Sequence, residues 1–204
     1  MFKNRQAAGE KLALGLRKYQ GEKPVVLGIP RGGVETAYYV ARELKAPLSI
    51  IITRKLPMPG NEELGFGAVA EDGSQVVLDY GYQWLRPEEI ERIIGEQKEE
   101  ISRRIEILRG GEDLPEIKDK TVIIVDDGMA MGVTMKVAVK MCQNKKAAKV
   151  IVAVPVSSKE AVADIGKMVD EVVVLEIPEW FQAVGQFYED FPQLTDEEVR
   201  EMIF

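Results

Sequence analysis

The stretch Val122-Ile-Ile-Val-Asp-Asp-Gly-Met-Ala-Met-Gly-Val-Thr134 decides how the rest of the sequence is interpreted. Its apolar first half predicts a buried strand that ends in two adjacent carboxylates, Asp126 and Asp127. A glycine-containing turn follows, and a helix is expected to begin near Thr134. Free backbone N–H groups at a helix start, reinforced by the helix dipole, form a cradle for a phosphate. Paired carboxylates suit a vicinal diol or a hydrated Mg²⁺. The stretch therefore predicts a site for a ribose 5-phosphate.

Other phosphate-binding motifs fit this stretch less well. A Walker A loop requires a lysine after its second glycine, and none follows Gly132. The dinucleotide-binding pattern Gly-x-Gly-x-x-Gly is absent from the sequence. Phospho-accepting receiver domains carry their aspartate pair after the first strand, whereas here it follows at least two predicted strands. A capped turn with a solvated aspartate pair is the purely structural alternative.

Around this stretch, short β-branched runs alternate with segments of helical length. This alternation predicts an α/β fold with a mostly parallel, twisted sheet flanked by helices. Ligands of such folds bind beyond the carboxyl ends of the strands. We expect strands at residues 24–29, 48–53, 121–126, 149–154 and 171–175, and helices at residues 2–19, 33–44, 87–108, 134–144 and 158–168.

One domain spanning residues 1–204 is expected, with two additions to the sheet. Residues 80–110 are expected to form a long helical insertion, whose charged face is solvated or, alternatively, binds a partner. Residues 176–204 are expected to form a small C-terminal hood or tail. Between the second strand and the insertion, residues 54–73 are rich in Gly, Pro and Glu. They predict a long loop that ends in a short hairpin of residues 66–70 against 75–78, and loops of this length are often lids.

Composition excludes several classes of function. The 204 residues are 46% hydrophobic and 30% charged, as in ordinary globular domains. A net charge of −7 argues against nucleic acid as a partner. The absence of histidine excludes Ser-His-Asp catalysis, and the single cysteine, Cys142, excludes an internal disulfide. No signal-peptide pattern or apolar run of about 20 residues is present, which predicts a cytoplasmic protein that does not contact membranes.

The sequence resembles the type I phosphoribosyltransferases. Residues 122–134 resemble their motif for binding phosphoribosyl pyrophosphate (PRPP): a hydrophobic strand, two acidic residues and a loop ending in Gly-x-Thr. Gly28-Ile-Pro-Arg-Gly-Gly33 follows the first predicted strand, as the pyrophosphate loop of the family does. Thr53-Arg-Lys-Leu-Pro-Met-Pro-Gly60 is similar to the start of the family's mobile catalytic loop. Residues 181–191 look like a group of uncharacterised bacterial and archaeal members.

The resemblance implies an enzyme that transfers 5-phosphoribose from Mg-PRPP to a nitrogenous base and releases pyrophosphate. It implies that Asp126 and Asp127 hold the ribose hydroxyls and, together with PRPP, Mg²⁺. It also implies a homodimer, on which the sequence itself is silent. The residues implied to bind the 5-phosphate are Gly128, Met129, Ala130, Met131, Gly132, Val133 and Thr134.

The leaving group has its own implied contacts. Arg31, Gly32 and Gly33 would touch pyrophosphate, because a bare glycine backbone lets N–H groups approach it closely. Arg54 and Lys55 would be the catalytic cations that neutralise its charge. Residues 54–66, which include Glu62 and Glu63, would be the lid that excludes water. The alternatives are a simple strand-to-helix turn at residues 31–33 and two surface charges at residues 54 and 55.

The acceptor is the part that the sequence defines least. Trp180 and Phe181 follow the last predicted strand and are candidates for stacking on a base. The alternative is a C-terminal segment that docks on the sheet or on a second subunit. Many members of the family have hydroxyl residues at the positions of Ala130 and Met131. Their absence favours a rival interpretation, a PRPP-binding regulatory protein without turnover. A third is an enzyme that uses water or an unusual amine as the acceptor.

Overall fold

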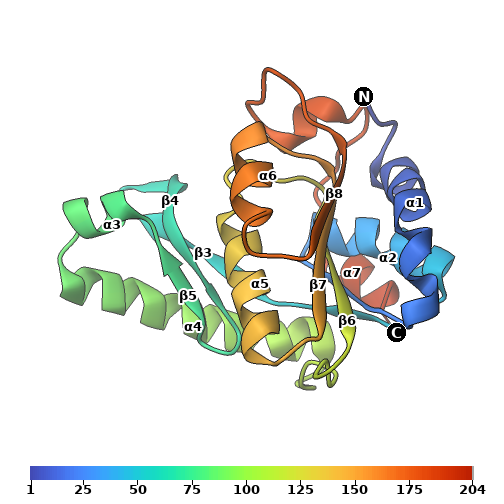
Figure 1. Cartoon of the computed structure of the whole chain (residues 1–204). Helices are drawn as coiled ribbons and strands as arrows, with labels where there is room; N and C mark the ends of the chain where they lie inside the picture. Colours follow the sequence, from blue (N-terminus) through green and yellow to red (C-terminus); the bar gives the residue numbers. More distant parts are fainter. Residues whose placement is uncertain (204) are drawn as a thin grey trace.

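A five-stranded parallel sheet forms the centre of the protein (Figure 1). The computed structural model describes the backbone of residues 1–203 and the side chains of residues 1–61 and 64–203. The strands lie in the order β2-β1-β6-β7-β8, and all neighbours are parallel, which confirms the predicted α/β fold. Their bounds are β1, Val25–Gly28; β2, Leu48–Ile50; β6, Thr121–Val125; β7, Lys149–Val156; and β8, Glu171–Glu176.

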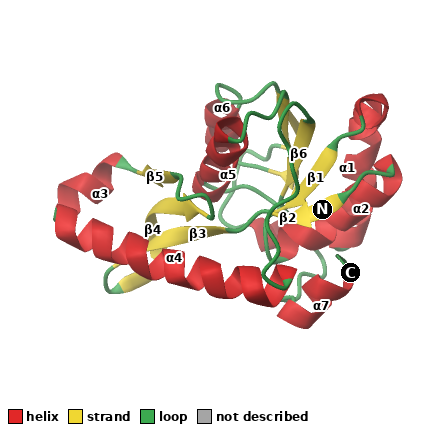
Figure 2. Cartoon of the chain, turned by 90° about the horizontal axis from the view of Figure 1, so that it is seen from below, coloured by secondary structure: helices red, strands yellow, loops and turns green. Residues whose placement is uncertain are grey.

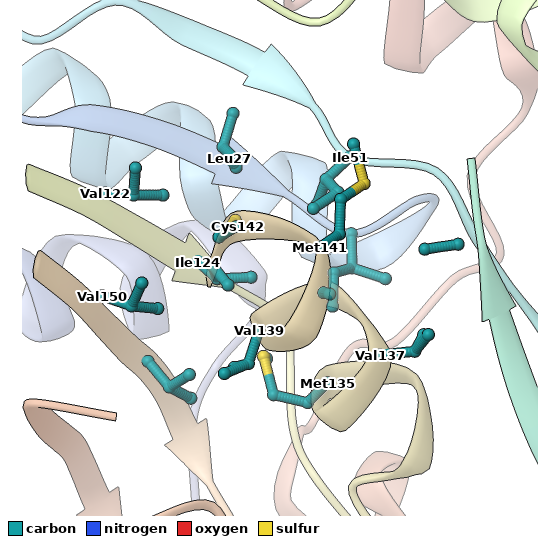
Figure 3. Packing of buried hydrophobic residues seen from close by; sticks show 14 of the residues in the cluster. Leu27, Ile51, Val122, Ile124, Met135, Val137, Val139, Met141, Cys142 and Val150 are labelled. Atoms are coloured by element: carbon teal, nitrogen blue, oxygen red, sulfur yellow. The ribbon is translucent and has the colours of Figure 1, made fainter. Parts of the chain in front are cut away.

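Helices cover both faces of this sheet. On one face, α1 (Arg5–Leu16) and α2 (Gly32–Leu44) pack on side chains such as Val26 and Ile123. On the other face, α5 (Val133–Asn144) packs on side chains such as Leu27 and Ile124 (Figure 3). The short helix α6 (Lys159–Ile165) joins the same cluster. Strands that are covered twice are apolar on both faces, which explains the unbroken runs of Val and Ile in their sequences.

The predicted N-terminal helix over residues 2–19 is shorter in the structure. Helix α1 begins after Asn4, whose side chain accepts a hydrogen bond from the Ala7 amide, and a 3₁₀ helix, η1 (Arg17–Glu22), follows α1. Among the described residues, no helix is both long enough and apolar enough to cross a membrane.

A second, smaller sheet replaces the predicted long loop. Strands β3 (Thr53–Met58), β4 (Asn61–Ala70) and β5 (Gln75–Val77) pair in antiparallel fashion. The predicted short hairpin is confirmed, since Gly67 lies opposite Val77. The prediction of a long loop over residues 54–73 was wrong, because most of these residues lie in β3 and β4. Leu56 and Phe66 are buried against α4, so packing stabilises strands whose proline and glycine content is typical of loops.

Helices α3 (Asp79–Trp84) and α4 (Pro87–Arg109) occupy the stretch predicted as a helical insertion. Figure 2 shows α3, α4 and the small sheet projecting to one side of the parallel sheet. Buried isoleucines of α4, including Ile90 and Ile94, cover the small sheet. The other end of α4 packs against α7 (Asp196–Glu201) near the C-terminus.

The segment after β8 returns to the N-terminus before it reaches α7. It contains a short 3₁₀ helix, η2 (Val184–Phe187). The Phe2 amide donates to the Phe187 carbonyl at 2.7 Å, and the Glu189 amide donates to the Phe2 carbonyl at 2.9 Å. Phe2 and Tyr188 are buried in one cluster with Val156, at the end of β7. The N-terminus and the segment between β8 and α7 are therefore joined beside the carboxyl edge of the parallel sheet.

Candidate active site at the carboxyl edge of the parallel sheet

A cavity of about 240 Å³ lies beside the carboxyl end of β6. β6 is a neighbour of β1, and the strand order changes direction between these two strands. Open α/β sheets bind ligands at such a switch point. The lining residues are Lys55, Gly65, Asp126, Gly128, Met129, Ala130, Met131, Gly132, Val133, Thr134, Met135 and Val184. The cavity thus includes every residue of the predicted phosphate loop.

The phosphate loop, residues 128–134, leads directly into α5. Gly132 precedes the helix with a φ of +69°, a left-handed conformation that favours glycine. The first turn of a helix leaves backbone N–H groups without intrahelical partners, and Val133 and Thr134 line the cavity. The structure thus places the loop predicted to bind phosphate at a helix N-terminus and in the wall of the cavity.

Two serines that directly follow β7 are hydrogen-bonded to backbone carbonyls of this loop. The Ser157 hydroxyl donates to the Met129 carbonyl at 3.1 Å, and the Ser158 hydroxyl donates to the Ala130 carbonyl at 2.6 Å. Ser158 also caps α6 by accepting a hydrogen bond from the Ala161 amide. The sequence analysis did not single out these serines, because their partners lie 28 residues away.

The two adjacent carboxylates point in different directions. Asp126 lines the cavity, and its Oδ1 accepts the Asp127 amide at 2.8 Å. The Asp127 carboxylate instead accepts the Arg5 Nε–H at 2.7 Å. Burial raises the pKa of Asp126 well above its usual range, and the negative charge of Asp127 raises it further. Burial also raises the pKa of Asp127, although the Arg5 guanidinium opposes that shift.

Arg5, which the sequence did not indicate, pairs with one of the two predicted site aspartates. Its side chain is 5% exposed although it begins a helix. Besides the contact with Asp127, it donates from Nη1 to the Pro192 carbonyl at 2.7 Å. Its guanidinium lies 3.8 Å from the centre of the Phe191 ring. No local pattern indicates these contacts, because Asp127 lies 122 residues away in the sequence.

The two glycines that begin α2 lie against the carboxylate pair. A Cβ on Gly33 would come within 2.6 Å of Asp126 Oδ1, and one on Gly32 would overlap Asp127 Oδ2. Only glycine allows this approach. The Arg31 side chain instead lies 3.7 Å from Asp196 of α7. The structure thus brings the two glycines to the aspartates and directs the Arg31 charge toward the C-terminal helix.

Arg54 and Lys55 lie on neighbouring positions of β3 and have different surroundings. Lys55 lines the cavity next to Gly65. Arg54 donates from Nε to the Gln97 side chain of α4 at 3.1 Å and does not line the cavity. Burial lowers the pKa of Arg54, as do the nearby cations of α4. The side chains of Glu62 and Glu63 lie outside the described residues.

The C-terminal segment reaches the cavity through Val184. Trp180 is 85% exposed and does not line the cavity. Phe181 packs on Phe187, with ring centres 5.2 Å apart, and lines a neighbouring cavity together with Met131. A Cβ on Gly128 would come within 2.5 Å of a Val184 methyl group. Val184 was not predicted as a site residue, although it lies within the C-terminal stretch that suggested the resemblance.

Comparison with known proteins identifies the family of this chain. A family model described as the phosphoribosyl transferase domain matches residues 2–192. The chain belongs to the phosphoribosyl transferase family. The match includes the phosphate loop, both aspartates, the glycines after β1, and Lys55.

Relatives within the phosphoribosyl transferase family agree in sequence and structure. A protein of Mycobacterium tuberculosis that is provisionally named a phosphoribosyl transferase is 41% identical over 201 residues. That match covers 98% of this chain, which spans only 45% of the relative's length. The crystal structure of TT1426 from Thermus thermophilus is 39% identical, with a TM-score of 0.84, and the match covers 100% of this chain and 97% of that one.

A more distant structure shares the fold. The crystal structure of a purine phosphoribosyltransferase from Pyrococcus horikoshii is 19% identical, with a TM-score of 0.50. The match covers 92% of this chain and 90% of that chain. The parallel sheet flanked by helices is therefore the fold of this family.

Proposed function

We propose that this chain transfers 5-phosphoribose from PRPP to a nitrogenous base and releases pyrophosphate. One observation carries the proposal: Asp126 and the phosphate loop line the same cavity, beside the two glycines that follow β1. A carboxylate accepts hydrogen bonds from sugar hydroxyls, and a helix N-terminus attracts a phosphate. Both groups belong to a single molecule of PRPP.

The chemistry requires charge stabilisation more than a nucleophilic side chain. Breaking the anomeric C–O bond leaves positive charge on the sugar and negative charge on pyrophosphate. Lys55 would balance the charge that develops on the leaving group. The backbone at Gly32 and Gly33 would donate hydrogen bonds to the same group. The β3–β4 hairpin, which carries Lys55 and Gly65, would exclude water that otherwise hydrolyses PRPP.

The residues of the cavity fit a magnesium ion that is shared with the substrate. Among the described residues, no group of three or more Asp, Glu, Cys or His side chains forms a metal site of its own. Protein-bound Mg²⁺ is commonly held by one or two carboxylates together with substrate phosphates and water. Asp126 lines the cavity and is the candidate carboxylate, whereas Asp127 is paired with Arg5. When bound, the ion would neutralise charge on the pyrophosphate group.

A regulatory protein that binds PRPP without turnover is the second candidate. The specific observation in its favour is that Ala130 and Met131 contribute no hydroxyl group to the phosphate loop, and Met131 is 55% exposed. A hydrogen bond to a charged group contributes about 1.5–3 kcal/mol, so each missing hydroxyl would weaken PRPP binding on the order of tenfold to a hundredfold.

Pyrophosphate release separates these functions. The protein would be mixed with PRPP and Mg²⁺, and a panel of purine and pyrimidine bases would be added one at a time. Release that depends on one base supports transfer, and the ribonucleotide product identifies the acceptor. Release without any base indicates hydrolysis. Saturable PRPP binding without release indicates the regulatory function and contradicts transfer to the bases tested.

A further inference from the structure

The ion pair between Arg5 and Asp127 lies between α1 and the segment that joins β8 to α7. Both side chains are largely buried, with exposed fractions of 5% and 15%. Arg5 comes from α1, whereas its other partners, the Pro192 carbonyl and the Phe191 ring, belong to the C-terminal segment. Glu35 of α2 is a more distant partner, at 3.8 Å. A buried guanidinium is retained only when such partners satisfy its charge and its donors.

Asp127 is held at its backbone as well as at its carboxylate. The Tyr188 hydroxyl donates to the Asp127 carbonyl at 2.6 Å. The Tyr188 ring contacts the rings of Phe2 and Phe191, with ring centres 5.5 Å and 4.8 Å apart. Residue 127 is therefore fixed by Arg5 on one side and by Tyr188 on the other.

The neighbours of Asp127 in the chain are ligand-facing residues. Asp126 precedes it and Gly128 follows it, and both line the cavity, whereas Asp127 does not. Any rotation of the peptides at residue 127 would move the Asp126 carboxylate and the start of the phosphate loop. Gly32 limits such rotation further, because it packs on the Arg5–Asp127 pair without space for a Cβ.

We propose that Arg5 is a positioning residue for PRPP, which acts by holding Asp127 while Asp126 alone of the two carboxylates contacts the ligand. The inference rests on the proposed function, since it names PRPP as the ligand of this cavity. It assigns different tasks to two adjacent acidic residues that the family motif treats as a pair. It also makes α1 and the C-terminal segment part of the binding machinery, although neither α1 nor Arg5 lines the cavity.

The test is a double-mutant cycle on the affinity for Mg-PRPP, measured by calorimetry. Arg5→Gln and Asp127→Asn should each raise the Kd at least tenfold, and the double variant should be no weaker than the weaker single variant. Arg5→Lys keeps the charge and should recover part of the affinity. The matched control is Arg17→Gln, which breaks an exposed ion pair with Glu43 just after α1 and should leave the Kd unchanged.

A milder variant covers the case in which Arg5→Gln does not fold. Tyr188→Phe removes only the hydroxyl that holds the Asp127 carbonyl, and it should raise the Kd about threefold or more, as expected for the loss of one hydrogen bond. Thermal unfolding of each variant distinguishes loss of positioning from loss of fold, because a positioning defect changes the Kd in protein that is still folded at the assay temperature.

Three results would overturn the inference. Strictly additive effects of Arg5→Gln and Asp127→Asn would show that the two residues act separately. Weak binding by Asp127→Asn with normal binding by both Arg5→Gln and Tyr188→Phe would show that Asp127 contacts PRPP itself. Failure of the unaltered protein to bind PRPP would overturn the proposed function, and the ligand named here with it. The first two results would leave the proposed function standing.

Discussion

At the scale of single residues, Asp126 joins two properties that oppose each other in a folded protein. Its carboxylate is available to a ligand, yet it is enclosed next to a second carboxylate. Burial and the charge of Asp127 raise its pKa, so the folded state binds this proton more tightly than the unfolded state does. Stability that is present at low pH is therefore lost as pH rises from the ordinary aspartate pKa through the raised one.

Asp126→Asn should accordingly stabilise the ligand-free protein at pH 8. The asparagine oxygen can still accept the Asp127 amide, and the buried charge is gone. The gain should shrink as pH falls toward the ordinary aspartate pKa of about 3.9. Urea unfolding of both proteins at several pH values measures this difference.

The control for this prediction is Asp164→Asn, which should have the opposite sign. Asp164 is half-exposed, and hydrogen bonds from Lys136 and Lys167 lower its pKa, so the charged form stabilises the fold at pH 8. A lower stability of Asp126→Asn than of the unaltered protein at pH 8 would contradict the assigned burial of Asp126.

At the scale of elements, the alternation of side chains along β3 determines which of two adjacent cations lines the cavity. Successive side chains of a strand point to opposite faces. Lys55 lies in the cavity, and Arg54 is hydrogen-bonded to Gln97 on α4. We therefore predict separate tasks for residues 54 and 55, although they stand together in the family motif.

If turnover is observed, Lys55→Gln should lower kcat at least tenfold more than Arg54→Gln does. The physical reason is that only the Lys55 charge can face the leaving group. Steady-state kinetics with saturating PRPP provides the comparison, and Lys18→Gln, in an exposed ion pair with Glu171, is a control for loss of a surface charge. Equal losses for residues 54 and 55 would contradict the assigned orientation of β3.

Gly65 of β4 gives an independent test of the same hairpin. A Cβ at this position would overlap the Lys55 side chain, so Gly65→Ala should displace Lys55. Gly65→Ala alone should lower turnover. When it is added to Lys55→Gln, it should lower turnover no further. The matched control is Gly95→Ala on the exposed face of α4, where a Cβ meets no atom within 4 Å. This control should stabilise the protein by about 0.5–1 kcal/mol.

The parallel sheet could be predicted from sequence, whereas the hairpin could not. Strands such as β6 are unbroken β-branched runs, a local signal of burial on both faces. The hairpin contains Pro57, Gly60 and Gly65, and it is held by packing of Leu56 and Phe66 against α4. That packing depends on residues far away in the sequence.

The same difference applies to the site. The phosphate loop and Asp126 form one continuous motif and were predicted. Arg5, Ser158 and Val184 reach the site from three other parts of the chain, and a single sequence carries no record of those contacts.

At the scale of the whole molecule, a buried ion pair connects the small sheet and α4 to the parallel sheet. Arg109, at the end of α4, pairs with Glu71, and both side chains are less than 10% exposed. Arg109 also donates from Nη1 to the Ile50 carbonyl at 3.0 Å, and Glu71 accepts the Ile52 amide at 3.0 Å. The hairpin that carries Lys55 is thus anchored next to β2.

Arg109→Met should destabilise the protein by about 3–5 kcal/mol, because Glu71 is left charged and buried without its partner. The double variant Arg109→Met with Glu71→Gln should lose less stability than Arg109→Met alone, because no unpaired charge is left buried. Urea unfolding measures both. Arg103→Met breaks an exposed pair on the same helix and should cost less than about 1 kcal/mol. A similar small loss for Arg109→Met would mean that this pair does not anchor α4.

The central claim is that the cavity beside β6 binds PRPP through Asp126 and the phosphate loop. Calorimetric titration of PRPP into the protein, with and without Mg²⁺, tests it most directly, with Asp126→Asn as the comparison. We predict saturable binding that is stronger with Mg²⁺ and at least tenfold weaker in folded Asp126→Asn. Absence of binding at millimolar PRPP, or equal affinity of the two proteins, would contradict the account.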